Sequence, residues 1–307
     1  MFGSGNAMSK KRVIIIIAIV SVVLLLAGSI LFIIKKGNKN MEIKCMSFNI
    51  LGIDGYDGYL PVGDRAQHLQ TYLNESGMDL IGLQEAGSHD YDWQGYFVSK
   101  IERDGVYKAV CIGNETAYDE QASRYPAGRV SNSAGLIILY KADRFDLLES
   151  GSQRYSSTEL QERHYQWAKF TDTYTGETVF MTNTHWSIDW DENGKVSAEA
   201  GDQHRTTQAN ELRTFWEEKV GDSLLFATGD YNCRQNTEWL QSAAKGIYKP
   251  VDIIMGNEEL HIDHIFLNTN RVEVVDYKFL NDRIVLDDGE HRYSDHDPAV
   301  VTVKISR

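Results

Sequence analysis

Apolar residues are distributed along this chain in two different ways. Residues 13–34 form a run of 22 positions without a charge, which as a helix would be about 33 Å long, close to the thickness of a bilayer's hydrocarbon core. From residue 41 onward, short apolar or alternating runs follow one another between polar turns. The first pattern predicts a membrane span, and the second predicts a globular domain with many strands.

The short runs of the second region predict nine strands and two helices. The strands are expected at residues 42–50, 79–85, 106–112, 134–140, 165–171, 177–185, 223–230, 262–268 and 298–305. Amphipathic helices fit residues 64–77, with Asp64 as the N-cap, and residues 200–220. Because few helices separate many strands, we expect packed sheets covered by helices rather than strict βαβ alternation.

The same patterns divide the chain into segments. We expect an N-terminal tail at 1–12, a transmembrane anchor at 13–34, a linker at 35–40 and one domain at 41–307. A cleaved signal peptide is the alternative for the apolar run, but the run is longer than usual for one and no small-x-small cleavage site follows it. Three cations stand on each side, so charge leaves the orientation open. With so short a tail, we favour a single-pass protein of the cell membrane with an extracytoplasmic domain.

Charge and cysteine content narrow the possibilities for the domain. The first 40 residues hold six cations and no acids, which leaves 25 basic against 44 acidic residues in the remainder, a formal charge of −19. Such a balance argues against sequence-independent binding to a nucleic acid backbone, although a local basic groove is still possible. The three cysteines match neither a disulfide framework nor a metal-binding pair, so we expect buried or idle thiols.

Polar residues gather at the ends of the expected strands. Side chains two apart share a face of a strand, so the face of Ile81 and Leu83 is expected to end in Glu85, and that of Met181 in Asn183 and His185. Other strands carry polar residues at their ends or starts: Ser47, Asn49, Asp230, Asn232, Asp263, Asp295 and His296. If the last two strands are antiparallel to the first four, these polar ends meet at one rim.

Each polar residue also has an ordinary explanation. Asn49 could be a turn former, Glu85 a solvated strand end and His185 a satisfied histidine near the core. Asp263 is harder to explain in this way, because burying an unpaired carboxylate at the start of an apolar row is costly. Several polar ends with the same placement favour a shared functional site over a coincidence.

An ordered set of motifs carries a resemblance to a known family. The stretches MSFNI, LQE, NTHW, GDYN, HIDHIFL and SDHDPAV follow one another, and in that order they resemble the endonuclease/exonuclease/phosphatase superfamily, the deoxyribonuclease I-like fold. The resemblance covers residues 41–307. It implies an α+β four-layer sandwich of two packed mixed β-sheets flanked by helices, and hydrolysis of a phosphate ester with a divalent cation.

The resemblance also implies roles for the motif residues. Glu85 looks like the principal metal ligand, with Asn49 and Asp295 close to the ion. The implied catalytic residues are His185 as donor to a phosphate oxygen, Asp230 and Asn232 to activate and orient water, and Asp263 to orient His296. Whether Asp230 or His296 takes the proton stays open. Carboxylate and amide oxygens suit Mg²⁺, the ion we expect, with Mn²⁺ or Ca²⁺ as alternatives.

The motifs indicate the chemistry and leave the substrate open. A lipid headgroup or small organic phosphate is favoured, a membrane-tethered nuclease is the alternative, and a catalytically silent binding module is the alternative of another class. Candidate substrate contacts are Tyr125, Arg129, Arg163 and Trp186. Their ordinary explanations are aromatic cover of the core edge and solubilising charge. The sequence gives no argument for an oligomeric state.

Overall fold

The computed structural model describes residues 41–87, 90–111, 135–157, 163–189 and 195–306. The chain divides into two compact units, residues 1–40 and 41–307, and the description below concerns the second. The predicted anchor at 13–34 lies outside the described residues. No helix in the described ranges is long and apolar enough to cross a membrane.

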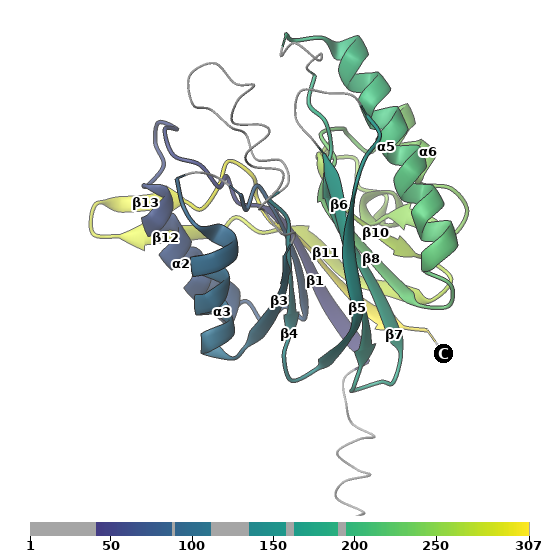
Figure 1. Cartoon of the computed structure of the whole chain (residues 1–307), viewed down its shortest axis with the longest axis horizontal. Coiled ribbons are helices and arrows are strands. Elements are labelled where there is room, and N and C mark those ends of the chain that lie inside the picture. Colours follow the sequence, from purple (N-terminus) through teal and green to yellow (C-terminus); the bar gives the residue numbers. More distant parts are fainter. Residues whose placement is uncertain (1–40, 88–89, 112–134, 158–162, 190–194, 307) are drawn as a thin grey trace, which may run out of the picture. The chain divides into compact units, whose positions relative to one another are not determined.

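Two six-stranded mixed sheets form the centre of the domain (Figure 1). The first has the order β11 (Val272–Phe279), β14 (Ala299–Ile305), β1 (Glu42–Asn49), β2 (Leu80–Gln84), β4 (Ile137–Lys141) and β3 (Tyr107–Cys111). The second has the order β5 (Phe145–Arg154), β6 (His164–Asp172), β7 (Thr178–His185), β8 (Leu224–Asp230), β10 (Asp263–Asn268) and β9 (Tyr248–Pro250). A separate hairpin joins β12 (Arg283–Leu286) to β13 (Gly289–Arg292).

Helices cover the outer face of each sheet, as Figure 1 shows. The helical elements are α2 (Val62–Glu75), the π-helical turn η1 (Trp93–Phe97), α3 (Val98–Asp104), α5 (Ala198–Lys219), α6 (Glu238–Ala243) and α7 (Val251–Met255). One apolar cluster lies between the sheets, a second packs the first sheet against α2 and α3, and a third packs the second sheet against α5 and α6. Two packed mixed sheets with flanking helices are therefore confirmed.

All nine expected strands are present, with boundaries that differ by at most three residues. Five further strands, β5, β9, β11, β12 and β13, were not expected, nor were the short helices. The prediction of Asp64 as a helix N-cap is wrong, because α2 begins at Val62. The Asp54 carboxylate accepts a hydrogen bond from the Val62 backbone N–H at 2.5 Å and so performs the capping from outside the helix.

Strand directions bring the polar strand ends together. β1 is parallel to β2 and β7 is parallel to β8, whereas β14 is antiparallel to β1 and β10 is antiparallel to β8. The carboxyl ends of the first four strands thus meet the amino ends of β10 and β14, as the rim prediction required. In the second sheet, His185, Asp230 and Asp263 stand in register on three neighbouring strands.

Candidate active site

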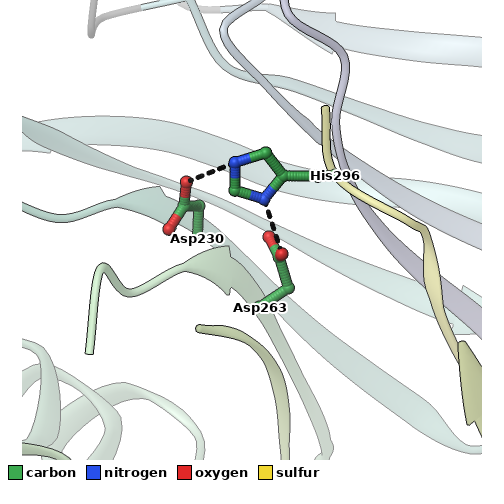
Figure 2. A group of neighbouring side chains, drawn as sticks. All are labelled: Asp230, Asp263 and His296. Carbon is green, nitrogen blue, oxygen red and sulfur yellow. Dashed lines mark hydrogen bonds and ion pairs between the residues drawn. The ribbon is translucent and has the colours of Figure 1, made fainter. Parts of the chain in front are cut away.

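His296 lies between two carboxylates at the rim, as Figure 2 shows. Its Nδ1 is 2.6 Å from Asp263 Oδ2, and its Nε2 is 3.7 Å from Asp230 Oδ2. Burial lowers the pKa of this imidazole, but the negative charges of Asp263 and Asp230 outweigh burial and hold the pKa well above 6.5. His296 is therefore a cation at neutral pH, oriented by Asp263, with one N–H directed toward Asp230.

Asn49 joins two acidic residues from the two sheets. Its Nδ2 donates hydrogen bonds to Glu85 Oε1 and to Asp230 Oδ2, both at 2.9 Å. Its Oδ1 accepts a hydrogen bond from the Leu51 backbone N–H at 3.1 Å, which fixes the direction of the amide. Asn49 thus directs its amide nitrogen toward the two carboxylates. In this arrangement it bridges Glu85 and Asp230 through hydrogen bonds, and its amide oxygen points to the Leu51 backbone.

Glu85 reaches the site through a break in strand geometry. The expectation that it shares a face with Ile81 and Leu83 was wrong, because those two side chains pack in the outer core with α2 and α3. At Glu85 the backbone φ is +60°, so the side-chain alternation of β2 ends there and the carboxylate turns toward Asn49. Gly52 passes so close that an added Cβ would lie 1.8 Å from the Glu85 carbonyl oxygen.

Left-handed backbone at non-glycine residues is concentrated at this rim. In the described part of the chain, the non-glycine residues with positive φ are Leu51, Glu85 and Asn232, which follow β1, β2 and β8. Each such residue costs roughly 1–3 kcal/mol and persists where surrounding contacts hold it. At Asn232 these contacts are its backbone N–H to Asp230 Oδ1 at 2.9 Å and its side-chain amide to the Trp186 carbonyl at 3.0 Å.

His185 has the opposite electrostatic setting to His296. Burial, with the positive charge of Arg163 nearby, lowers its pKa to about 3, although Asp230 opposes the shift. Its Nε2 lies 3.5 Å from Asp230 Oδ2, and its Nδ1 is buried without a hydrogen-bond partner among the described residues. His185 is therefore neutral, with a single N–H to donate.

The donor set at the rim fits a hard divalent cation. Burial raises the pKa of Glu85, and the negative charges of Asp230 and Asp295 raise it further. The hydrogen bond from Asn49 and the positive charge of His296 lower it, but the pKa remains raised overall. Asp295 itself is exposed and accepts a hydrogen bond from Ser294 Oγ at 3.2 Å. Carboxylates this close together repel one another when ionised, and a bound cation would relieve that repulsion. Glu85 and Asp295, with Asp230 beside them, are the residues that would hold it.

A second cluster of possible ligand atoms is better explained as a proton-transfer pair. Atoms of Asp230, Asp263 and His296 lie within 4.8 Å of one another. The short contact between Asp263 Oδ2 and His296 Nδ1 already occupies one ligand atom of each residue. The other Asp263 oxygen is buried without a partner among the described residues.

A buried polar layer lies beneath the rim; the sequence reasoning singled out its Ser47 and Asn183 but missed Gln84 and Thr228. Gln84 Nε2 donates to Asn183 Oδ1 at 2.6 Å across the two sheets, and Thr228 Oγ1 donates to the same oxygen at 3.1 Å. Ser47 Oγ accepts from the Gly229 backbone N–H at 3.0 Å, again between sheets. The available signal was polar residues at inward strand positions, where apolar ones are usual. This layer fixes the two halves of the site relative to each other.

His264, on β10, supports the site from behind. It is fully buried, with Nδ1 at 2.9 Å from Asp252 Oδ2 and Nε2 at 2.9 Å from the Cys233 carbonyl oxygen. Because Cys233 adjoins Asn232, this pair restrains the loop that carries Asn232.

The expected substrate contacts have different outcomes. Trp186 is fully buried, and its Nε1 donates to Tyr155 Oη at 3.1 Å, so the expectation of a substrate contact is corrected to core packing. Arg163 is 2% exposed, and its charge acts on His185, which places it near the site as a buried residue. Tyr125 and Arg129 lie outside the described residues.

Comparison with known proteins gives both a family and similar folds. Residues 46–296 match the endonuclease/exonuclease/phosphatase family. No curated protein sequence matches the chain. Among solved structures, the human Nocturnin catalytic domain with bound sulfate is 16% identical, with a TM-score of 0.65, and the match covers 86% of this chain and 94% of that one.

Two further structures are similar over the same extent. The mannosyl-6-phosphatase of Bacteroides thetaiotaomicron is 20% identical (TM-score 0.63; 86% of this chain and 100% of that one). TDP2 of D. rerio, in complex with a single-strand DNA product, is 19% identical (TM-score 0.62; 85% and 98%). At these identities the likeness shows the fold, whereas the family match spans most of the sequence. The chain belongs to the endonuclease/exonuclease/phosphatase family.

Proposed function

We propose that this protein is a membrane-anchored, divalent-metal-dependent hydrolase of phosphate esters. The observation that carries the proposal is the placement of His296 between Asp263 and Asp230, with the Asn49–Glu85 pair on the other side of Asp230. This places a general acid, a general base and oxygens that could bind a cation close together at one rim of the two sheets. This is the combination that water attack on a phosphoryl group needs.

The charge states suggest a division of labour between acid and base. Since the raised pKa keeps His296 protonated at neutral pH, Asp230 is the better base and His296 the better donor. Asp230 takes a proton from the attacking water, whose oxygen bonds to phosphorus. The bond from phosphorus to the leaving oxygen breaks, and His296 Nε2–H protonates that oxygen. A proton can then return from Asp230 to His296 across their 3.7 Å separation.

Two further residues complete the proposed mechanism. Neutral His185 donates its N–H to a phosphoryl oxygen, and Asn232 orients the water beside Asp230. When bound at Glu85 and Asp295, Mg²⁺ would neutralise charge on the phosphoryl oxygens and favour deprotonation of water. Mn²⁺ or Ca²⁺ could take the same oxygens.

For the substrate, we propose a small organic phosphate or a lipid headgroup rather than nucleic acid. The formal charge of −19 on residues 41–307 disfavours the phosphate backbone of a long polyanion. One similar structure is named as a phosphatase of a phosphorylated sugar. Another holds a single-strand DNA product, so a tethered nuclease is the second candidate, and strongly salt-sensitive DNA binding would favour it.

The test is to follow phosphorus NMR of a substrate mixture incubated with the protein and Mg²⁺. The mixture contains an oligonucleotide, a phosphocholine lipid, a phosphoinositide and a nucleotide. We expect one signal to shift with wild type, and Glu85→Gln and His296→Ala each to slow turnover by about 10²–10⁴-fold. The matched control is His291→Ala on the β13 hairpin, which should retain wild-type turnover.

Two results would contradict the proposal. Near-normal turnover in both site variants would show that the site is elsewhere. A wild-type protein that binds Mg²⁺ at Glu85 but hydrolyses no phosphate ester would instead favour the silent binding module.

A further inference from the structure

Arg65 on α2 is a buried arginine whose side-chain hydrogen bonds to the described residues all go to backbone carbonyls. It is 2% exposed. Its Nε donates to Leu60 O at 3.0 Å, Nη1 to Ile50 O and Tyr293 O at 3.1 Å each, and Nη2 to Ile53 O at 2.7 Å. None of these acceptors is a carboxylate, which is unusual because a buried cation is normally paired with an anion.

Three of the four carbonyls belong to segments that carry site residues, and the fourth, that of Leu60, precedes α2. Ile50 and Ile53 flank the left-handed Leu51 just after Asn49. Tyr293 comes directly before the Ser294–His296 segment. Arg65 Nη1 alone donates to both Ile50 and Tyr293, so one guanidinium nitrogen ties the segment after β1 to the segment before β14.

Neighbouring carboxylates, two of them in the site, partly offset the burial of the Arg65 charge. Burial lowers the pKa of its guanidinium, and the negative charges of Asp54, Asp295 and Glu85 oppose this shift. Two of these three carboxylates are the proposed cation-binding residues. The arginine therefore lies behind the site, close enough to act on its carboxylates, while its N–H groups are used to hold the backbone.

We propose that Arg65 is a positioning residue that sets the separation between the Asn49–Glu85 side and the Asp295–His296 side of the site. A divalent cation shared between Glu85 and Asp295 needs both sides at the correct distance, and residues that support ligands in this way typically affect metal affinity or activity 10–100-fold. A planar guanidinium can hold four carbonyls in fixed directions, whereas an ammonium cannot. The inference rests on the proposed function for its activity readout and on the proposed cation site for its Mn²⁺ readout.

The test compares Arg65→Lys with Arg144→Lys in the full chain. Arg144 is also 2% exposed and buried in polar contacts, with Asp172, Asp79 and the Glu42 carbonyl, but it is at the opposite end of the strands. Lysine keeps the positive charge in both variants. A difference between either variant and the wild type therefore reports the loss of the guanidinium geometry at that position. The readouts are Mn²⁺ affinity, from the metal-induced rise in melting temperature, and kcat and KM for bis(p-nitrophenyl) phosphate.

We expect Arg65→Lys to weaken Mn²⁺ binding and lower kcat by about 10–100-fold each, with KM changed less. Arg144→Lys should lose thermal stability but keep Mn²⁺ affinity and kcat within about twofold. Equal effects of the two substitutions on both readouts, or wild-type values in Arg65→Lys, would overturn the proposal. If Arg65→Lys does not fold, Arg65→Gln provides the same two readouts. A wild type that binds Mn²⁺ but turns over no ester would refute the proposed function, while the Mn²⁺ comparison would still decide the role of Arg65.

Discussion

His296 and His185 have opposite charge states within one rim. Asp263 and Asp230 raise the pKa of His296 well above 6.5, whereas burial and Arg163 lower that of His185 to about 3. Pairs of titratable groups whose surroundings separate their pKa values mark a division between acid and base roles. In the proposed mechanism, His296 therefore carries the mobile proton and His185 acts only as a neutral donor.

Replacing Asp263 with asparagine should move the alkaline limit of activity to lower pH. The substitution removes the charge that most strongly raises the pKa of His296, so His296 should lose its proton roughly 1–3 pH units earlier. Because the folded pKa lies above the unfolded value of 6.5, the stability from this pair is fully present below pH 6.5. It is lost as pH rises through the folded pKa.

The measurements are kcat/KM from pH 5 to 10 and urea unfolding near pH 6 and pH 9 in the presence of a chelator. The wild type should be more stable than Asp263→Asn, and the difference in the free energy of unfolding should be larger near pH 6 than near pH 9. Asp276→Asn, an exposed carboxylate paired with Lys278, is the control and should change neither profile. An unmoved alkaline limit in Asp263→Asn would exclude His296 as the titrating group.

At the scale of elements, the sheets are held in register by close polar packing rather than by apolar contacts alone. An added Cβ on Gly82 of β2 would lie 2.0 Å from Thr228 Oγ1 of β8 and 2.8 Å from Asn183 Oδ1 of β7. The glycine therefore lets two strands of the second sheet approach β2 at the polar layer. Since Asn49 and Asp230 stand just above this layer, the spacing there sets the hydrogen bond between them.

Gly82→Ala should destabilise the domain and weaken the site. Overpacking of this kind costs about 1–3 kcal/mol in the free energy of unfolding, and kcat should fall because the sheets must separate. Gly63→Ala in α2 is the matched control, since the nearest atom to its added Cβ is 4.0 Å away, and it should be neutral or stabilise by about 0.4–1 kcal/mol. Urea unfolding and kcat check both variants; equal stability of the two would show that the sheets are not closely packed at this layer.

Sequence periodicity predicted the strands that bury one face and missed those that do not. β5 is exposed at most of its positions and β11 is interrupted by a bulge between Val274 and Asp276, so neither shows a clean alternation. The rim followed from strand ends alone, because it depends only on strand direction. The turn of Glu85 toward Asn49 and the carbonyl contacts of Arg65 depend on left-handed backbone and on distant segments, which local patterns do not encode.

At the scale of the whole molecule, the start of β1 and the rim lie at opposite ends of the same strand. β1 begins at Glu42, directly after the linker, and ends at Asn49 in the site, so its 8 residues separate the two ends by about 26 Å. The linker at 35–40 could extend to about 21 Å at most. If residues 13–34 are in a bilayer, as we propose, a linker of this length cannot span β1 and bring the rim to face that bilayer directly.

The full chain in lipid vesicles should therefore hydrolyse a soluble small organic phosphate but not the headgroups of its own vesicle. Inserting about 12 flexible Gly/Ser residues after Asn40 should allow headgroup hydrolysis, because the longer linker would exceed the length of β1. Release of phosphate or of the headgroup is measured for both chains, with His296→Ala carrying the same insertion as the inactive control. Headgroup hydrolysis at equal rates with and without the insertion would contradict the proposed anchoring geometry. Hydrolysis of the soluble ester alone by both chains would identify the small organic phosphate, rather than the lipid, as the substrate class.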